Sequence, residues 1–335
     1  MKNKKLLVTA SAVLASISLL VSSTPASATV TSFGKWSNRT QTMYIATSSA
    51  NSTAWSSGAA KWKSNTNFNV STKLGTSSIY YAYDVNDSSV TWDGICTYTT
   101  RSGIITKATL QLNTYYTNQS KYTSSIKAGV TGHEVGHSLG LNHTSAVETS
   151  SIMYPNTFNS DGTPARSVNP SSSDISVVNN LYPVLPTATA TGVGSKGDGV
   201  YLHASWSVGY KNKEELTKAA DLVVKGTVSK EKGSKFGKKG DYSTYSTEVN
   251  VEISEVLKGD PAQEGQNITV SQMGGTDGEV TVYSDSSTHL RKNQEIMLFL
   301  REVNGDTYIP INEDDSIFVN EGGSFKNIAS KKELE

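Results

Sequence analysis

Thiols, surplus charge and long apolar stretches are all scarce in this sequence, and each scarcity excludes a class of protein. The single cysteine, Cys96, rules out an internal disulfide framework and any cluster of thiolate metal ligands. Thirty Lys and Arg residues balance 30 Asp and Glu residues, and a chain without a basic surplus argues against nucleic acid as its main partner. A mean hydropathy of −0.37 excludes a protein with several membrane spans. The 335 residues are enough for two domains, each with its own core.

The one long apolar run, from Leu6 to Val21, lies close to the N-terminus. Lysines precede it, and small residues ending in Ala-Ser-Ala at positions 26–28 follow it. A basic start, an apolar core and an A-x-A ending are typical of a secretory signal peptide. A membrane anchor is the alternative reading of the same run. We expect a signal peptide over residues 1–28, cleavage after Ala28, and a mature chain that is secreted and extracellular.

The composition changes near residue 190. Residues 29–190 hold 10 basic and 7 acidic side chains, whereas residues 191–335 hold 17 basic and 23 acidic ones. Residues 185–198 are rich in Thr, Ala and Gly, which is typical of a linker. The sequence therefore predicts a first domain over residues 29–184, a linker over residues 185–198 and a second domain over residues 199–335.

Hydrophobic periodicity gives the two domains different fold classes. In the first, Trp55, Ala59 and Trp62 share one face of a predicted helix at residues 52–63. Further helices are predicted at residues 124–139 and 171–181, with strands at residues 78–85, 92–100 and 107–113. Three helices beside a mixed sheet indicate an α+β domain. The second domain has Gly-rich turns and hardly any helix, which favours a small all-β barrel or sandwich. Its predicted strands are residues 221–228, 247–256, 267–272, 279–282, 295–300 and 307–311.

Three of the five histidines lie within one eleven-residue segment, His-Glu-Val-Gly-His-Ser-Leu-Gly-Leu-Asn-His. His133 and His137 are four residues apart, so on a helix both imidazoles can reach one metal ion. Gly140 allows the chain to leave the helix with a positive φ, which lets His143 return as a third ligand. Three nitrogen ligands leave the fourth tetrahedral position open for water, as in a catalytic zinc site. Glu134 lies beside the first ligand and can take a proton from that water.

The segment Ser-Ile-Met-Tyr-Pro follows at residues 151–155. A long zinc motif followed by such a methionine turn resembles the metzincin metallopeptidases, and the Met-Tyr-Pro ending most resembles the matrixins. The resemblance spans about residues 33–183 and is specific over residues 133–155. It implies that Met153 forms the floor beneath the three imidazoles, and that Tyr154 and Pro155 line the pocket for the side chain after the scissile bond. Asp174 is either a carboxylate near the methionine turn or simply a residue that starts a helix.

The resemblance implies a secreted zinc endopeptidase, of the kind that bacteria export, acting on proteins or peptides. Zinc activates a water, and Glu134 takes its proton and delivers it to the leaving amine. An edge strand within residues 92–100 binds the substrate by strand addition. The alternative is a zinc-holding extracellular binding or adhesion protein, whose C-terminal β domain carries the function or regulates the protease in cis.

The chain also departs from the matrixin pattern in its metal ligands. Many matrixin domains hold a second, structural zinc through histidines before the catalytic helix, and no histidine precedes His133 here, so we expect that site to be missing. Calcium is possible because Asp84, Asp87, Asp93 and Asp161 are expected in loops, although isolated loop aspartates are more often turn residues. We expect one catalytic zinc ion, with calcium left open.

Few residues separate the predicted cleavage site from the first domain, so we expect no propeptide that blocks the zinc. Cys96 is expected to be a small buried residue, with a self-blocking or redox-sensitive thiol as the alternative. His203 and His289 are isolated in the sequence, and neither is assigned a function. We expect no nucleic-acid partner, no stable membrane insertion and a monomeric protein.

Overall fold

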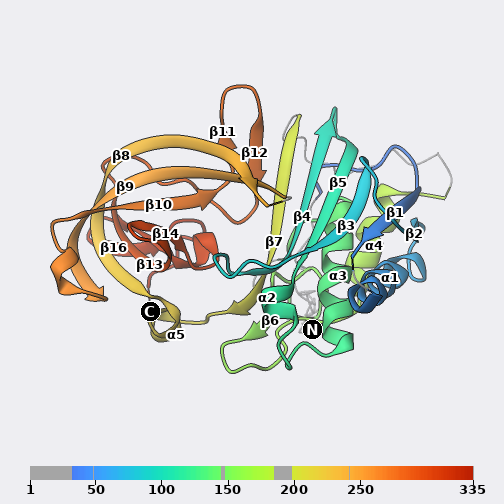
Figure 1. Cartoon of the computed structure of the whole chain (residues 1–335), viewed down its shortest axis with the longest axis horizontal. Helices are drawn as coiled ribbons and strands as arrows, with labels where there is room; N and C mark the ends of the chain where they lie inside the picture. Colours follow the sequence, from blue (N-terminus) through green and yellow to red (C-terminus); the bar gives the residue numbers. More distant parts are fainter. Residues whose placement is uncertain (1–31, 48, 145–147, 185–197, 241, 335) are drawn as a thin grey trace, which may run out of the picture.

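The computed structural model describes residues 32–47, 49–144, 148–184, 198–240 and 242–334. The predicted signal peptide and all but the last residue of the predicted linker lie outside these ranges. Figure 1 shows two sheets side by side, with the larger helices packed on the outer face of one of them. Within the described ranges, no helix has the length and apolarity needed to cross a membrane.

The three predicted helices of the N-terminal half are confirmed. They are α1 (Ser49–Lys63), α3 (Ser124–Ser138) and α4 (Ser172–Leu181), with a short helix α2 (Thr114–Thr117) between them. The α1 face that carries Trp55, Ala59 and Trp62 is buried, with these side chains at most 1% exposed. The indole of Trp62 donates a hydrogen bond to the carbonyl of Gly132 at 2.7 Å, which joins α1 to α3.

These helices cover a nine-stranded sheet with the order β11-β12-β7-β4-β5-β3-β1-β2, in which β6 pairs with β7. Its strands are β1 (Thr40–Ala46), β2 (Asn69–Leu74), β3 (Tyr80–Val85), β4 (Trp92–Arg101), β5 (Ile104–Asn113), β6 (Asn156–Asn159), β7 (Gly199–Gly209), β11 (Gly275–Thr276) and β12 (Thr281–Ser284). The predicted strands β3, β4 and β5 are confirmed, whereas β1, β2 and β6 are additional. A mixed sheet covered by a few helices is the metzincin-like fold that the sequence predicts.

Three strands of this sheet, β7, β11 and β12, come from the chain beyond the predicted linker (Figure 1). Strand β7 pairs antiparallel with β4 from Trp92↔Trp206 to Thr100↔Gly199. On its other side, β4 pairs with β5. The expectation that residues 92–100 form an edge strand is therefore wrong, because a later segment of the same chain occupies that edge.

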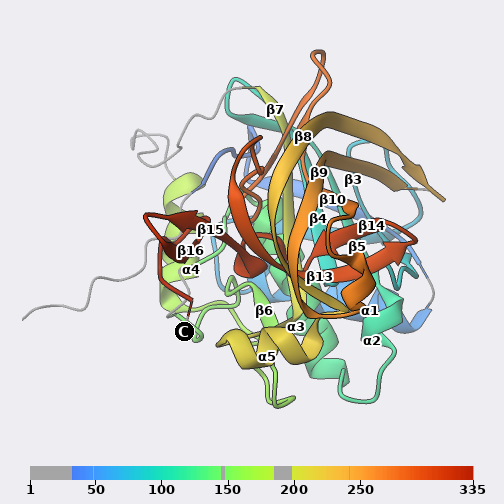
Figure 2. The ribbon, with the colours of Figure 1, turned by 90° about the vertical axis from the view of Figure 1, so that its left-hand side faces the viewer.

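The C-terminal half forms a seven-stranded sheet with the order β14-β10-β9-β8-β13-β15-β16. Its strands are β8 (Leu222–Lys239), β9 (Tyr242–Lys258), β10 (Asn267–Met273), β13 (Glu295–Asn304), β14 (Thr307–Pro310), β15 (Ile317–Glu321) and β16 (Ser324–Asn327). Because β14 pairs with both β10 and β13, the pairing path of five strands closes on itself. Figure 2 looks onto this sheet and shows β8 and β9 curving across it.

All six strands predicted for the C-terminal half are present, and the helical content is small. It consists of α5 (Lys213–Ala219) and two 3₁₀ helices, η1 (Pro261–Gln263) and η2 (Glu313–Ser316). Alternate residues of β8, β9 and β13, such as Val224, Ile253 and Leu298, are at most 1% exposed and form the core of this half. The β-rich class predicted from the short strands is thus confirmed.

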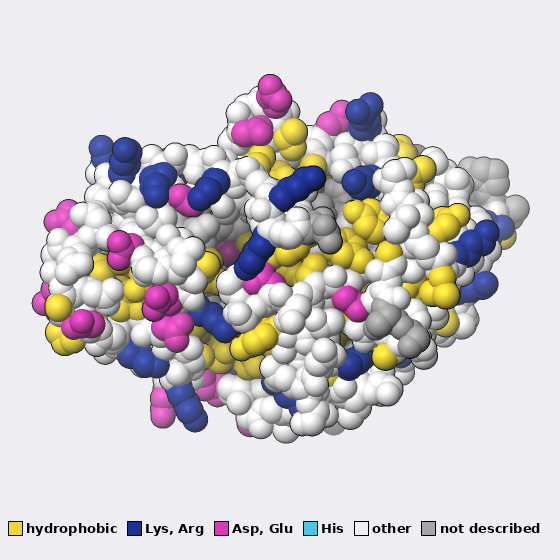
Figure 3. Space-filling model, in the orientation of Figure 1, with side chains coloured by type: hydrophobic (Ala, Val, Ile, Leu, Met, Phe, Trp, Pro, Cys, Tyr) yellow, Lys and Arg dark blue, Asp and Glu magenta, His cyan; other side chains and the backbone are white. Residues whose placement is uncertain are grey.

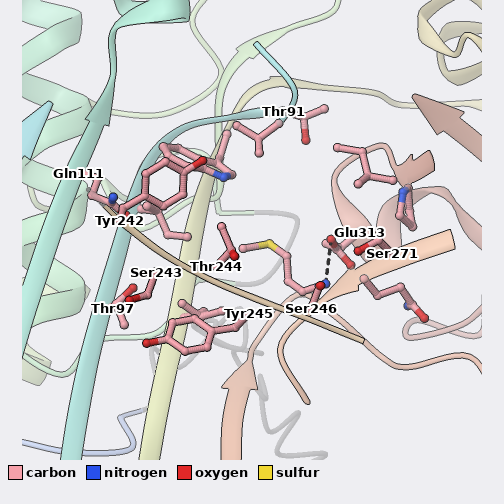
Figure 4. A pocket seen from close by; sticks show the side chains of 18 of the residues that line it. Thr91, Thr97, Gln111, Tyr242, Ser243, Thr244, Tyr245, Ser246, Ser271 and Glu313 are labelled. Carbon is pink, nitrogen blue, oxygen red and sulfur yellow. Dashed lines mark hydrogen bonds between the residues drawn. The ribbon is translucent and has the colours of Figure 1, made fainter. Parts of the chain in front are cut away.

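A cavity of about 200 Å³ lies between the two sheets, and hydrophobic side chains are visible in the hollow between the two halves (Figure 3). Its lining includes Ile95, Leu202 and Trp206 from one sheet, Tyr245 and Met273 from the other, and Glu313 from η2. Figure 4 shows this pocket from close by, with Tyr245 and Glu313 labelled. Side chains alternate between the faces of a strand. The neighbours Cys96 and His203 therefore point the opposite way, toward α3.

Candidate metal centre

Helix α3 and the turn that ends it bring the three histidines of the motif together. The turn is a Schellman motif, in which Gly140 N–H donates to His137 O at 2.8 Å and Leu141 N–H donates to Gly136 O at 3.2 Å. Gly140 has a φ of 102°, as the sequence predicts. A Cβ atom there would lie 1.9 Å from the carbonyl oxygen of Gly34, so both conformation and space require glycine. This reversal returns His143 to the face of α3.

The Nε2 atoms of His133, His137 and His143 converge. They lie 2.9 Å apart for His133 and His137, and 3.2 Å apart for each of the other two pairs. Tetrahedral zinc with Zn–N bonds of about 2.0–2.1 Å places its nitrogen ligands about 3.3 Å from one another. Among the described residues, these three histidines are the one group of His, Cys, Asp or Glu with the spacing of a metal site.

The Nδ1 atom of each ring has an acceptor, which fixes the state of its Nε2 atom. His133 Nδ1 lies 2.6 Å from Ile152 O, His137 Nδ1 lies 2.7 Å from Leu141 O, and His143 Nδ1 lies 3.0 Å from Asp285 Oδ2. A neutral ring that donates from Nδ1 has a lone pair on Nε2. Three lone pairs that face one another repel, whereas a zinc ion between them would be bound by all three. The donor set therefore fits a zinc site.

Burial favours the neutral form of two of these rings, which is the form that a metal ligand needs. His133 and His137 are fully buried. Burial, with smaller contributions from neighbouring positive groups, lowers the pKa of both rings well below the usual range. Neither ring needs to lose a proton near neutral pH before it binds a cation.

Glu134 lies next to His133 on α3 and is fully buried. Its two carboxylate oxygens have no hydrogen-bond partner of good geometry among the described residues, although Ser205 on β7 is near enough to lower its pKa. Burial raises the pKa of Glu134 well above its usual range, and the guanidinium charge of Arg166 partly opposes this rise. Strand β4 passes close by, since a Cβ atom on Gly94 would lie 2.5 Å from Glu134 Oε1. The site thus holds an unpaired carboxyl group beside the three ring nitrogens.

The methionine turn packs beneath the histidines. Met153 is fully buried, and a Cβ atom on Gly136 would lie 2.4 Å from its sulfur, so glycine lets the turn approach α3. Tyr154 O accepts a hydrogen bond from Arg166 Nη1 at 3.2 Å. Pro155 O accepts one from Trp206 N at 2.9 Å, which connects the turn to β7.

Asp174 fills both roles that the sequence leaves open. It forms a capping box with Ser171 at the start of α4. Its carboxylate also accepts hydrogen bonds from Ser151 Oγ at 2.7 Å and from Ile152 N at 3.2 Å. One buried carboxylate therefore joins the helix start to the methionine turn.

Two residues at the centre, His203 and Asp285, were not predicted to be there. The His203 ring, 1% exposed, stacks on the His137 ring with centroids 4.5 Å apart and planes at 15°. Asp285 Oδ2 lies 2.9 Å from His203 Nδ1 and 3.0 Å from His143 Nδ1. Burial acts to raise the pKa of Asp285, but its interactions with the two imidazoles outweigh burial and hold the pKa well below its usual range. Neither residue lies in a motif, so the sequence alone offers no signal for this placement.

The remaining candidates lie apart from one another. Asp84 and Asp93 lie in β3 and β4 rather than in loops. Asp84 accepts a hydrogen bond from Asn51, Asp87 from Lys239, Asp93 from Tyr122 and Asp161 from Thr163. The four aspartates do not converge, and calcium stays a prediction. Cys96 is fully buried in the core, as expected for a packing residue, and burial raises its pKa well above the usual range.

Comparison with known protein families agrees with this site. Residues 19–183 match the sequence model of the matrixin family. No curated protein matches the chain. Similar solved structures include myroilysin, with 16% identity, a TM-score of 0.34, and coverage of 47% of this chain and 98% of that one. Another is high choriolytic enzyme 1, a hatching-enzyme zinc protease from the medaka Oryzias latipes, with 15% identity, a TM-score of 0.28, and coverage of 44% and 92%. TM-scores this low carry no argument about function. The family match, the zinc motif and its methionine turn together show that the chain carries a matrixin-type zinc metallopeptidase domain.

Proposed function

We propose that the chain is a secreted zinc endopeptidase that hydrolyses peptide bonds in proteins. The observation that carries the proposal is the convergence of three histidine Nε2 atoms beside a buried, unpaired glutamate. Three nitrogen ligands with an open fourth position are typical of catalytic zinc rather than structural zinc. The signal peptide predicted over residues 1–28 supports export, and a second ion, calcium, stays an open part of the proposal. The closed pairing of β8, β9, β10, β13 and β14 supports a small C-terminal barrel.

In this proposal His133, His137 and His143 hold the zinc ion, with their Nδ1 atoms anchored to two backbone carbonyls and one carboxylate. Zinc supplies Lewis acidity that activates a water molecule and polarises the scissile carbonyl. The acceptors of the three Nδ1 atoms keep the imidazole rings in one tautomer and one orientation. Met153, packed against Gly136, supports the rings from below.

Glu134 is the general base. Its oxygens make no other hydrogen bond among the described residues, so the carboxylate is available to accept a proton from the attacking water. Burial raises its pKa well above the usual range, which makes the carboxylate a stronger base toward the attacking water. After attack, Glu134 delivers the proton to the leaving amine. Tyr154 and Pro155 lie at the turn beside this centre, where they line the pocket for the side chain after the scissile bond.

Hydrolysis of casein by the purified mature chain, residues 29–335, tests the proposal. Each sample is assayed with and without 1,10-phenanthroline, and its zinc content is measured. Glu134→Ala should keep zinc and lose nearly all cleavage, with Glu148→Ala as a control outside the histidine motif. Normal cleavage by Glu134→Ala would contradict the assignment of the base.

A second candidate is favoured by the cover that β7 and Asp285 place over the histidines. In a zinc-holding binding protein, such a cover would be permanent and the metal would serve stability alone. That protein would bind zinc and cleave nothing, even when the cover is opened. The variants described next therefore separate the two candidates.

A further inference from the structure

We propose that strand β7 and Asp285 form an intramolecular latch that occupies the substrate site, so that the chain is latent until β7 leaves β4. This inference rests on the proposed peptidase function, because it names the regulation of that same site. It requires that β7 lie where a peptide substrate would lie, that it block the centre, and that other contacts hold it in place.

Strand β7 lies between two segments of the matrixin-like half. It pairs antiparallel with β4 along residues 92–100 and parallel with β6 through Trp206, Val208 and Gly209. Since β5 occupies one side of β4, β7 takes the other side, where a peptide could otherwise pair with β4. An extended peptide binds to a sheet edge through backbone hydrogen bonds, and two strands cannot pair with the same edge. Substrate and β7 therefore exclude each other.

The side chains of β7 that face α3 cover the centre. His203 stacks on His137, and Ser205 Oγ donates a hydrogen bond to Asp93 Oδ1 at 2.7 Å beside Glu134. Asp285, which follows β12, connects His203 to His143 through one oxygen, and its side chain is only 12% exposed. Since Glu134 and His137 are fully buried, a protein substrate reaches them only in molecules in which β7 has left β4.

Contacts outside the centre hold the latch closed. Strand β12 pairs with β7 at residues 200–202, and Asn312 Nδ2 donates to Val208 O at 2.7 Å. Between the two halves, Lys239 pairs with the buried Asp87 at 2.6 Å, and Arg301 donates to Tyr116 OH at 2.7 Å. Contacts with the C-terminal half thus hold β7 against β4. Separation of β7 from β4 requires that these contacts break together.

A reversible lock tests the latch in the full mature chain. Thr99 and Val200 are paired across β4 and β7, on the face opposite the histidines. Antiparallel partners have Cα atoms about 4.5–5.5 Å apart, which a disulfide can bridge. We expect the oxidised Thr99→Cys/Val200→Cys variant to bind a fluorescent peptide hydroxamate, a zinc-directed probe, at least about tenfold more weakly than its reduced form. The single variant Thr99→Cys should not respond to the reductant.

A release variant tests the opposite direction. Trp206 N–H donates toward β6 and Ser207 N–H donates to Thr91 O beside β4. Since N–H groups alternate along a strand, Ser205 N–H points toward β4 and Ala204 N–H points away. Ser205→Pro should break the β4–β7 ladder and tighten hydroxamate binding at least about tenfold, whereas Ala204→Pro should change it less. Zinc content and circular dichroism establish whether each variant is folded. If Ser205→Pro does not fold, the disulfide lock alone decides whether β7 blocks the zinc centre.

The outcomes separate the latch from the peptidase. Equal probe binding by the oxidised and reduced lock would overturn the latch, even if casein is cleaved by every form. Probe binding that follows lock and release would support the latch. If the zinc-loaded Ser205→Pro variant binds the probe but leaves casein intact, the proposed endopeptidase activity is wrong. The inference that β7 covers the zinc centre would still be supported.

Discussion

Asp285 is the most informative residue to perturb, because it connects the C-terminal half to a zinc ligand. Its Oδ2 atom accepts a hydrogen bond from His143 Nδ1 at 3.0 Å, whereas His133 and His137 each donate from Nδ1 to a backbone carbonyl. We predict that Asp285→Ala weakens zinc binding without abolishing it. The side chain that orients His143 would be lost, while all three ligands would remain.

The magnitude follows from the position of this contact. Removal of a carboxylate that orients a ligating histidine typically lowers metal affinity 10–100-fold. That range corresponds to about 1.4–2.7 kcal/mol of binding free energy. The 12% exposure of the Asp285 side chain favours the upper part of the range, because little water can replace the lost acceptor.

Competition with a fluorescent zinc chelator measures the change in dissociation constant. Asp277→Ala is the matched control, since this exposed aspartate lies between β11 and β12 and accepts hydrogen bonds from its own turn. An unchanged zinc affinity for Asp285→Ala would refute the reasoning that this carboxylate orients His143. If the latch is also correct, the same variant at saturating zinc should bind the peptide hydroxamate more tightly.

Three further predictions concern stability. Gly140→Ala should lower the free energy of unfolding, measured in urea, by about 3 kcal/mol, because of the positive φ and the contact with Gly34. Gly162→Ala is the control, since Gly162 has a φ of 84° but open space around it, and it should cost about 1 kcal/mol. Equal losses would contradict the role of the contact with Gly34. Burial raises the pKa of Glu313 to about 8 from 4.5, so the folded chain holds an extra proton between these values. Stability should fall by up to about 5 kcal/mol as pH rises from 4.5 to 8, and Glu313→Gln should flatten that slope; an unchanged slope would refute the assignment. Asp174→Ala should cost about 3 kcal/mol in the same urea assay, because it removes the capping box and two hydrogen bonds to the methionine turn. An unchanged free energy of unfolding would show that the methionine turn does not need this carboxylate.

The sequence predicts what is local. His133, Glu134, His137 and Gly140 lie within a helix and its exit, so their relative positions follow from the helical repeat and one positive φ. The buried face of α1 and the alternation in β4 and β5 follow from the same kind of short-range pattern. The metal centre was predictable because its ligands come from a single stretch of chain.

The cover over the centre depends on pairing between distant segments. His203 and Asp285 lie beyond the linker, and no spacing rule connects them to His137 or His143. Register between distant strands is fixed by the hydrophobic faces that the whole fold buries, which one strand's pattern does not reveal. For the same reason, β4 was predicted as an edge strand: its own sequence is identical whether or not β7 pairs with it.

The pairing of β4 with β7 also bears on solubility. Residues 92–100 read Trp-Asp-Gly-Ile-Cys-Thr-Tyr-Thr-Thr, with one charged side chain and no proline. An exposed strand of this composition is a template for self-association, and proteins usually protect such edges. While β7 is in place, this edge is protected by the chain itself. A molecule that has lost β7 offers the same backbone groups to substrates and to other copies of itself, so activity gained by opening would come with concentration-dependent aggregation.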